Sequence, residues 1–192
     1  MRAAAEAFIS KHGVPDLVIG NAGVSYGNDT AIAEDVEVFR EILEINVLGL
    51  VNTFHPFVGP MRERKAGTLA GIASVAGFRG LPWGTAYSAS KAAAISYLEG
   101  LRVELRGSGV RVTTICPGFI ATDMTKKNPY TMPFLIGADD AARRFARAMD
   151  AGKSYTVIPW QMAIVGRLLR VLPTPVFDAL LAGRGRKPRK VV

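Results

Sequence analysis

A tyrosine and a lysine four residues apart, Tyr87 and Lys91, are the first pair in this chain that could move a proton. Apolar residues recur after them at helical spacing, at Ala94, Leu98, Leu101 and Leu105. On a helix, residues four apart lie one turn from each other on the same side. A phenol ionises at about pH 10, and a nearby ammonium favours the phenolate. We therefore expect Lys91 to lower the pKa of Tyr87 and make it a general acid–base.

A serine after an apolar run supplies a second polar group for the same site. Residues 68–73 predict a buried strand, and Ser74 follows it directly, thirteen positions before Tyr87. Parallel strands deliver their last side chains into a crevice at the carboxyl edge of the sheet. We expect Ser74 to lie in that crevice with Tyr87; the alternative is that it merely ends the strand.

Three further points carry small or polar residues beside predicted elements. Asn21-Ala22-Gly23 follows the apolar run 17–19, Asn46 interrupts a long helical pattern, and Cys116-Pro117-Gly118 follows a strand predicted at 110–115. Small residues at a strand end let a ligand approach the backbone. Two alternatives stay open, since Asn46 could cap a helix that begins there and Pro117-Gly118 could be a simple turn.

Taken together, these residues resemble the short-chain dehydrogenase/reductase family, and the resemblance extends from Leu17 to about Pro159. It implies an oxidoreductase that uses NAD or NADP to interconvert a carbonyl and an alcohol by hydride transfer. On this resemblance Tyr87 would exchange the proton, and Lys91 would lower its pKa and hold the nicotinamide ribose. Ser74 would hydrogen-bond the substrate oxygen as charge develops on it. Asn46 would position a water in a proton relay to Lys91.

The resemblance also implies which residues contact the cofactor besides Tyr87 and Lys91. Asn21, Ala22 and Gly23 would line the adenosine side. The nicotinamide would be received by Pro117, Gly118, Ile120 and Thr122, with the threonine hydroxyl reaching its carboxamide. For the substrate we expect a lipophilic carbonyl compound, because the candidate pocket residues are mostly apolar: Phe78, Trp83, Met124, Met132, Phe134 and Leu135.

Predicted strands and helices alternate along the chain. Helices are expected at 2–12, from 34, from 46, from about 87 to 106 and at 139–149, and strands at 17–19, 68–74, 110–115 and 154–159. This order predicts an α/β fold with a doubly wound parallel sheet of Rossmann type. Residues 1–159 would form a partial Rossmann-like catalytic domain, and 160–192 an apolar helical segment with a basic tail. We expect the first strand, at 17–19, to be buried on both faces.

The family's glycine-rich phosphate loop, Gly-x-x-x-Gly-x-Gly, is absent before residue 21. The fold is therefore expected to be truncated at its N-terminus relative to the family, by roughly 55–65 residues at ordinary element lengths. The residue that would choose between NAD and NADP is absent with it. An alternative function follows, a catalytically silent fragment or binding partner that lacks the phosphate-binding loop.

Composition excludes several other classes. At 192 residues the chain predicts one domain, and a single cysteine excludes an internal disulfide framework and offers no metal-site spacing. No run of 18 uninterrupted apolar residues occurs, which predicts no membrane-spanning helix. The N-terminus carries no secretory pattern, so we expect a cytoplasmic protein.

The C-terminal segment supports two hypotheses. Apolar residues recur through it, at Trp160, Met162, Ile164, Val165, Leu168, Leu169, Val171, Leu172, Phe177, Leu180 and Leu181. It could lie on an anionic membrane surface, or cover the substrate pocket or a homo-oligomer interface, which we favour. The net charge of +8 is concentrated at the end, in Arg184, Arg186, Lys187, Arg189 and Lys190. We expect this basic tail to be solvated and disordered, and no nucleic acid to bind.

Overall fold

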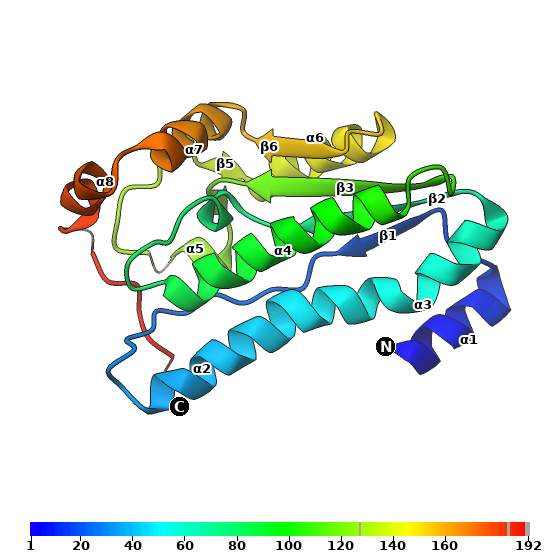
Figure 1. Ribbon diagram of the computed structural model, residues 1–192, viewed down its shortest axis with the longest axis horizontal. Helices are drawn as coiled ribbons and strands as arrows, with labels where there is room; N and C mark the ends of the chain where they lie inside the picture. The colour runs from blue at the N-terminus through cyan, green and yellow to red at the C-terminus, as the bar shows by residue number, and fades with distance from the viewer. Residues whose placement is uncertain (127, 184, 191–192) are drawn as a thin grey trace.

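A four-stranded parallel sheet forms the centre of the protein in a computed structural model that describes residues 1–126, 128–183 and 185–190 (Figure 1). Its strands lie in the order β1-β2-β3-β6, with bounds β1 (Leu17–Gly20), β2 (Gly67–Ile72), β3 (Val110–Pro117) and β6 (Tyr155–Ile158). Two short strands, β4 (Ile120–Ala121) and β5 (Ile136–Gly137), pair in parallel beside it. The predicted parallel sheet is confirmed.

Helices cover both faces of this sheet. Their bounds are α1 (Arg2–His12), α2 (Glu34–Leu43), α3 (Gly49–Arg64), α4 (Thr85–Glu104), α5 (Asp123–Lys126), α6 (Ala138–Asp150), α7 (Gln161–Val171) and α8 (Thr174–Leu181). On one face, Leu69 of β2 packs with Phe54 of α3 and Leu98 of α4. On the other, Ala70 packs with Met149 of α6. Adjacent strand residues point to opposite faces, so this division confirms the doubly wound architecture.

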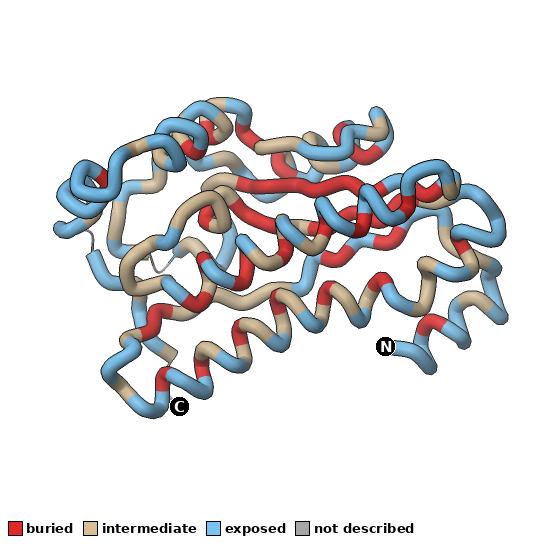
Figure 2. Tube along the Cα trace, in the orientation of Figure 1, coloured by how far each residue is buried: buried red, intermediate tan, exposed pale blue. Residues whose placement is uncertain are grey.

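The buried face of α4 lies where the sequence places it. Ala94, Leu98, Leu101 and Leu105 are all buried. Figure 2 shows β3 buried along nearly its whole length beside this helix. The helix that carries Tyr87 and Lys91 is therefore fixed against the centre of the sheet.

Strand β1 differs from its prediction. It lies at the edge of the sheet, where Val18 is buried under α3, but Leu17 and Ile19 are 40% and 44% exposed. The prediction of burial on both faces is wrong, because the described part of the chain places no helix over the second face of β1.

The two helices predicted from residues 34 and 46 form one continuous helical segment. Between α2 and α3 the backbone adopts a π-helical turn, η1 (Glu44–Leu48). The inner side of α2 carries Val38 and Ile42, with Phe39 packed against them, and Val36 is exposed. Pro56 and Pro60 lie inside α3 without ending it.

One helix in the described part of the chain, Glu34–Arg64 taken as a whole, is long and apolar enough to cross a membrane, with a mean hydropathy of 1.2 over its best window. The sequence predicts none, because the criterion of uninterrupted apolar residues is stricter. Core helices of soluble proteins pass the same test, and Leu50 and Phe54 of this helix belong to the core. Length and composition alone are therefore weak evidence for a span.

The basic tail is docked, contrary to the prediction of a solvated end. The Gly27 amide donates a 2.9 Å hydrogen bond to the Pro188 carbonyl, and Arg189 and Lys190 form ion pairs with Asp35 and Glu41. Figure 1 shows the tail returning to the start of α2. The sequence could not show this, because the partners lie about 150 residues away in the chain; Arg184, also assigned to the tail, lies outside the described residues.

Candidate active site

The predicted catalytic residues meet where the carboxyl ends of β2 and β3 reach the N-terminus of α4. Ser74 lies two residues after β2, Gly118 directly after β3, and Tyr87 in the first turn of α4. A cavity of about 860 Å³ opens between them and is lined by all three. The crevice expected at this edge of the sheet is therefore present, and the side chains expected in it face it.

Ser74 is buried, and its hydroxyl bridges two segments. The oxygen accepts a 3.1 Å hydrogen bond from the Ala76 amide, which caps a short 3-10 turn, and it donates a long one of 3.4 Å to the Pro117 carbonyl. It also interacts with the Tyr87 phenol, and this hydrogen bonding acts to lower the pKa of Tyr87. Ser74 thus ends the strand segment and lines the cavity, so the two alternatives are compatible.

Lys91 lies beside Tyr87, but the predicted effect on the phenol is not observed. The Lys91 ammonium is 5.8 Å from the centroid of the Tyr87 ring and donates a 2.9 Å hydrogen bond to the Ile72 carbonyl. Burial raises the pKa of Tyr87, and Ser74 offsets only part of that rise. The expectation of a lowered pKa is wrong for this structure, because desolvation of the phenolate is the larger effect. Burial also lowers the pKa of Lys91 to about 8.

Asn46 occupies the π-helical turn with its side chain turned inward. Its Oδ1 accepts a 2.8 Å hydrogen bond from the Val24 amide, and its Nδ2 donates to the Val24 carbonyl at 2.9 Å and to Ser90 Oγ at 3.0 Å. The alternative of a helix cap is wrong, because helical backbone continues on both sides of Asn46. The residue instead ties the loop after β1 to α4.

Gly23 is the predicted cofactor residue that reaches this cluster. A Cβ built on Gly23 would lie 3.2 Å from Asn46 Oδ1 and 3.5 Å from Lys91 Nζ. Asn21 and Ala22 are exposed beyond the end of β1. The chain after β1 therefore passes directly over Asn46 and Lys91, and the lack of a side chain at Gly23 allows this close approach.

The predicted nicotinamide residues divide into two groups. Pro117 is buried and Gly118 lines the cavity, while Ile120 lies in β4. Thr122 is exposed and its carbonyl accepts from the turn that begins α5; Thr125 lines the cavity in its place.

Only one of the six predicted pocket residues lines the cavity, Met124. Phe78 packs against Gly166 of α7, and Trp83 lies under the guanidinium of Arg186, 3.7 Å from the ring centroid. Phe134 and Leu135 are exposed. Much of the apolar lining comes from α7 and α8, at Met162, Val165, Leu169, Leu180 and Leu181. The C-terminal helices therefore cover the pocket, as the favoured hypothesis expects.

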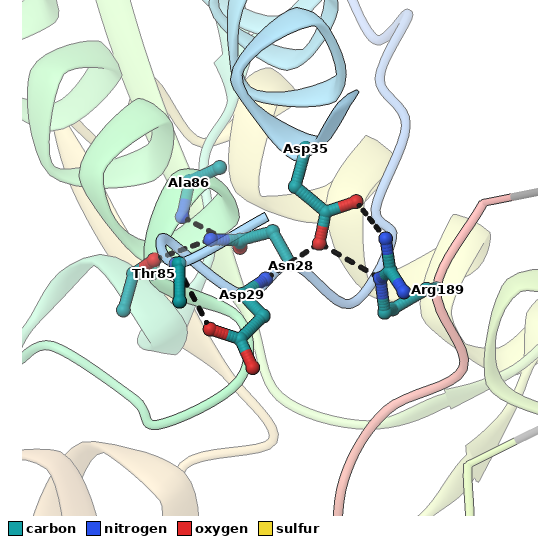
Figure 3. Close-up of polar contacts among 7 residues, drawn as sticks. Asn28, Asp29, Asp35, Thr85, Ala86 and Arg189 are labelled. Carbon is teal, nitrogen blue, oxygen red and sulfur yellow. Dashed lines mark hydrogen bonds and ion pairs between the residues drawn. The ribbon is translucent and has the colours of Figure 1, made fainter. Parts of the chain in front are cut away.

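Two buried residues that the sequence does not single out, Asn28 and Ser90, hold α4. Asn28 Nδ2 donates a 2.7 Å hydrogen bond to Thr85 Oγ1, and its Oδ1 accepts from the Ala86 amide at 3.2 Å (Figure 3). Ser90 accepts from Asn46 and donates to the Tyr87 carbonyl at 2.7 Å. Asn28 caps a helix 57 residues ahead, which no local pattern reveals. Ser90 could have been found from the sequence, since it lies one position before Lys91.

The side chains present fit the nicotinamide end of a dinucleotide. Ser74, Tyr87 and Gly118 line one cavity, with Lys91 buried beside it. No Gly-x-x-x-Gly-x-Gly turn that could receive the pyrophosphate precedes residue 21 in the described part of the chain. No group of three or more His, Cys, Asp or Glu side chains that could hold a metal ion occurs among the residues with described positions.

Comparisons with known proteins agree with this geometry. The family model for short chain dehydrogenases matches residues 1–132. An uncharacterized oxidoreductase of Myxococcus xanthus is 45% identical over 164 residues, which cover 85% of this chain and 64% of the relative. Dehydrogenase/reductase SDR family member 7B of Rattus norvegicus is 31% identical over 199 residues, 97% of this chain and 61% of the relative. The chain thus spans less than two thirds of the length of these curated relatives.

A solved structure extends the comparison to the fold. The crystal structure of a short chain dehydrogenase from Burkholderia cenocepacia, in complex with NADP, superposes with a TM-score of 0.80 at 26% identity, covering 94% of this chain and 74% of that chain. The family model matches more than half of this chain, and the parallel sheet presents Ser74, Tyr87 and Lys91 at its carboxyl edge. The chain therefore belongs to the short-chain dehydrogenase family.

Proposed function

We propose that this protein interconverts a carbonyl and an alcohol with NAD or NADP, and that Tyr87 exchanges the proton. The observation that carries the proposal is the shared cavity of Ser74 and Tyr87, with Lys91 buried one helical turn away. The NADP bound to the Burkholderia cenocepacia relative supports the cofactor class.

The proton step uses groups that are already in contact. NAD(P)H, when bound, would supply the hydride for reduction. Tyr87 would then donate its phenolic proton to the carbonyl oxygen. Ser74 donates a hydrogen bond to the same oxygen while negative charge builds on it. The present bond from Ser74 to Pro117 is long, at 3.4 Å, so the hydroxyl exchanges it readily for a substrate oxygen.

Burial gives Tyr87 and Lys91 complementary tasks. Because burial raises the pKa of Tyr87, the phenol keeps its proton at neutral pH and is ready to donate it. After donation the phenolate needs a positive charge nearby, and the Lys91 ammonium lies 5.8 Å from the ring. Asn46, bonded to Ser90 and adjacent to Gly23, holds this part of the site and supports a relay to Lys91.

The test is steady-state turnover of a Tyr87→Phe variant with NADH or NADPH and a medium-chain ketone. Loss of the general acid is expected to lower kcat by roughly 10²- to 10⁴-fold. Tyr97→Phe is the matched control, since Tyr97 lies on the same helix and packs against the core away from the cavity. Equal turnover by Tyr87→Phe and wild type would refute the proposal.

A catalytically silent binding partner is the second candidate, since the residues before position 21 contain no Gly-x-x-x-Gly-x-Gly turn. It predicts that wild type shows no turnover and that Tyr87→Phe leaves any nucleotide affinity unchanged. We prefer the enzymatic function, because a binding partner has no need for a phenol, a hydroxyl and an ammonium gathered at the carboxyl edge of the sheet.

The substrate class proposed is a lipophilic carbonyl compound. The cavity is lined mainly by apolar side chains of α7, α8 and the segment after β4. Small-molecule pockets of this kind bind through apolar contact and a few placed polar groups. A rise in kcat/KM with the chain length of the ketone would support this class, and no change would oppose it.

We also propose a homo-oligomer that buries the outer face of α2 and of the π-helical turn η1. Val36 and Leu48 are 51% and 55% exposed there and line a shallow groove with Phe39 and Leu43. A second copy of this chain would cover this surface. Light scattering should show Leu48→Arg at a lower mass than wild type, while Val171→Arg on α7 keeps the wild-type mass.

A cytoplasmic protein that touches an anionic membrane through α7 is a further proposal. Trp160, Ile164, Leu168 and Val171 form an exposed apolar stripe, 64%, 50%, 59% and 75% exposed, on the side of α7 away from the cavity. Such a stripe suits an interfacial helix. Co-sedimentation with phosphatidylserine vesicles should be lost in an Ile164→Gln, Leu168→Gln variant; equal binding of this variant would exclude the contact.

A further inference from the structure

The cavity beside Tyr87 contains one charged side chain among its described lining residues, Lys187 of the C-terminal tail. The other lining side chains are apolar or neutral and polar. A single ammonium in such surroundings is costly unless an anion pairs with it. The position of Lys187 therefore calls for a physical explanation.

Lys187 is half-buried and has no carboxylate partner within the described ion pairs. Its Nζ donates a 2.6 Å hydrogen bond to Ser25 Oγ and lies 5.6 Å from the centroid of the Tyr87 ring. Burial lowers the pKa of Lys187 to about 8. Arg189 and Lys190 of the same tail are paired with Asp35 and Glu41, and Arg186 stacks on Trp83, whereas Lys187 faces the cavity.

The tail backbone is fixed on both sides of this contact. Gly27 donates to the Pro188 carbonyl, and a Cβ built on Gly27 would lie 2.1 Å from the Lys187 carbonyl oxygen. Arg189 forms two hydrogen bonds of 2.8 Å with Asp35 (Figure 3). Arg186, on the other side, stacks on Trp83. Lys187 is therefore held at the cavity by its neighbours.

We propose that Lys187 is a specificity-determining residue that forms a subsite for an anionic group, so that preferred ligands join an apolar body to a carboxylate. The proximity of Lys187 to Tyr87 places that carboxylate within a few bonds of the reacting carbonyl; this last point rests on the proposed function, and the anion subsite does not. A carboxylate would form a charge-assisted hydrogen bond with the ammonium in a cavity of low polarity. A neutral ligand would displace water from the ammonium without offering a charged hydrogen-bond partner in its place.

The test compares octanoate with octanamide by isothermal titration calorimetry, because the two ligands match in shape and differ in charge. We expect wild type to bind octanoate at least about tenfold more tightly than octanamide. Lys187→Met should abolish the preference, while Lys187→Arg should retain it. Lys153→Met removes the same charge from an exposed position and should behave as wild type.

Two results would overturn the proposal: equal affinities of wild type for the two ligands, or an undiminished preference in Lys187→Met. Circular dichroism of each variant checks that it is folded, and Lys187→Arg keeps the comparison valid if the methionine variant unfolds. Binding is measured without cofactor or turnover. A negative result in the Tyr87→Phe assay would therefore leave this test unaffected.

Discussion

The carboxylate of Asp35 accepts two hydrogen bonds of 2.8 Å from the guanidinium of Arg189, which joins positions 154 residues apart in the sequence. The same carboxylate accepts a 2.7 Å hydrogen bond from the Asp29 amide. Asn28, which precedes Asp29 in the chain, caps the helix that carries Tyr87. The loop at Asn28 and Asp29 thus connects the C-terminal tail to α4.

Replacing Asp35 with Asn should release the tail. The amide can accept only one of the two guanidinium bonds and carries no charge, so the bidentate pair is lost. Hydrogen–deuterium exchange should then rise at residues 185–190 and 24–29. Glu37→Gln on the same helix is the control, because Glu37 forms an exposed pair with Arg40. Unchanged exchange in Asp35→Asn would show that the tail is held by other contacts.

Acid should release the tail in the wild-type protein. The hydrogen bonds from Arg189, followed by that from the Asp29 amide, lower the pKa of Asp35 from its ordinary value of 3.8. A carboxyl with a lowered folded pKa stabilises the fold fully above its unfolded value and loses this contribution as pH falls through the folded value. The fluorescence of Trp83, stacked under Arg186, should therefore stay constant down to about pH 4 and change only below it. A change centred near neutral pH would contradict this assignment.

Lys91→Met should stabilise the protein while removing turnover. Burial lowers the pKa of Lys91 from 10.5 to about 8, so the ammonium destabilises the fold below pH 8 and this cost disappears above the unfolded value. Urea denaturation at pH 7 should show a free energy of unfolding higher by about 1–3 kcal/mol. The difference should shrink as pH rises above about 8 and vanish above about 10.5. Lys11→Met is the control and should change stability little, because Lys11 lies on the exposed side of α1. If Lys91→Met is instead less stable than wild type, the hydrogen bond from Lys91 to the Ile72 carbonyl contributes more than the burial of the charge costs.

Asn28→Ala should weaken the N-terminus of α4. The substitution removes the acceptor of the Ala86 amide and the donor to Thr85, and loss of a helix cap costs about 1 kcal/mol. A lower melting temperature together with a lower kcat is expected, because Tyr87 follows within the first turn. Asn52→Ala, at an exposed position inside α3, should leave both unchanged. Loss of stability with an unaltered kcat would assign Asn28 a purely structural part.

The sequence predicts much of the sheet and the positions of three site residues. Apolar runs locate β2 and β3, and the spacing after Tyr87 gives the buried face of α4. Ser74 follows because it comes directly after the apolar run 68–73, and Lys91 follows because it lies four residues after Tyr87 on one helix. These features depend only on which residues are neighbours in the sequence, so a single sequence is enough to predict them.

Other features depend on contacts between distant segments. The exposure of Leu17 depends on whether anything covers the edge strand, and the cap by Asn28 joins residues far apart in the chain. The tail is basic and polar, so its composition resembles that of a solvated end even though Asp35 and Glu41 receive it. The pKa of Tyr87 depends on burial, which spacing does not reveal.

The π-helical turn at Glu44–Leu48 has a consequence for how the chain tolerates changes in length. Buried residues recur at every fourth position from α2 into α3, at Val38, Ile42, Asn46, Leu50 and Phe54. In a regular helix of about 3.6 residues per turn, each such step overshoots by roughly 40°, and the wider turn absorbs part of this drift. Deleting one residue within it would rotate α3 by about 100° against α2. Insertions and deletions should therefore be accepted in the surface loops and rejected here, even where individual side chains are free to vary.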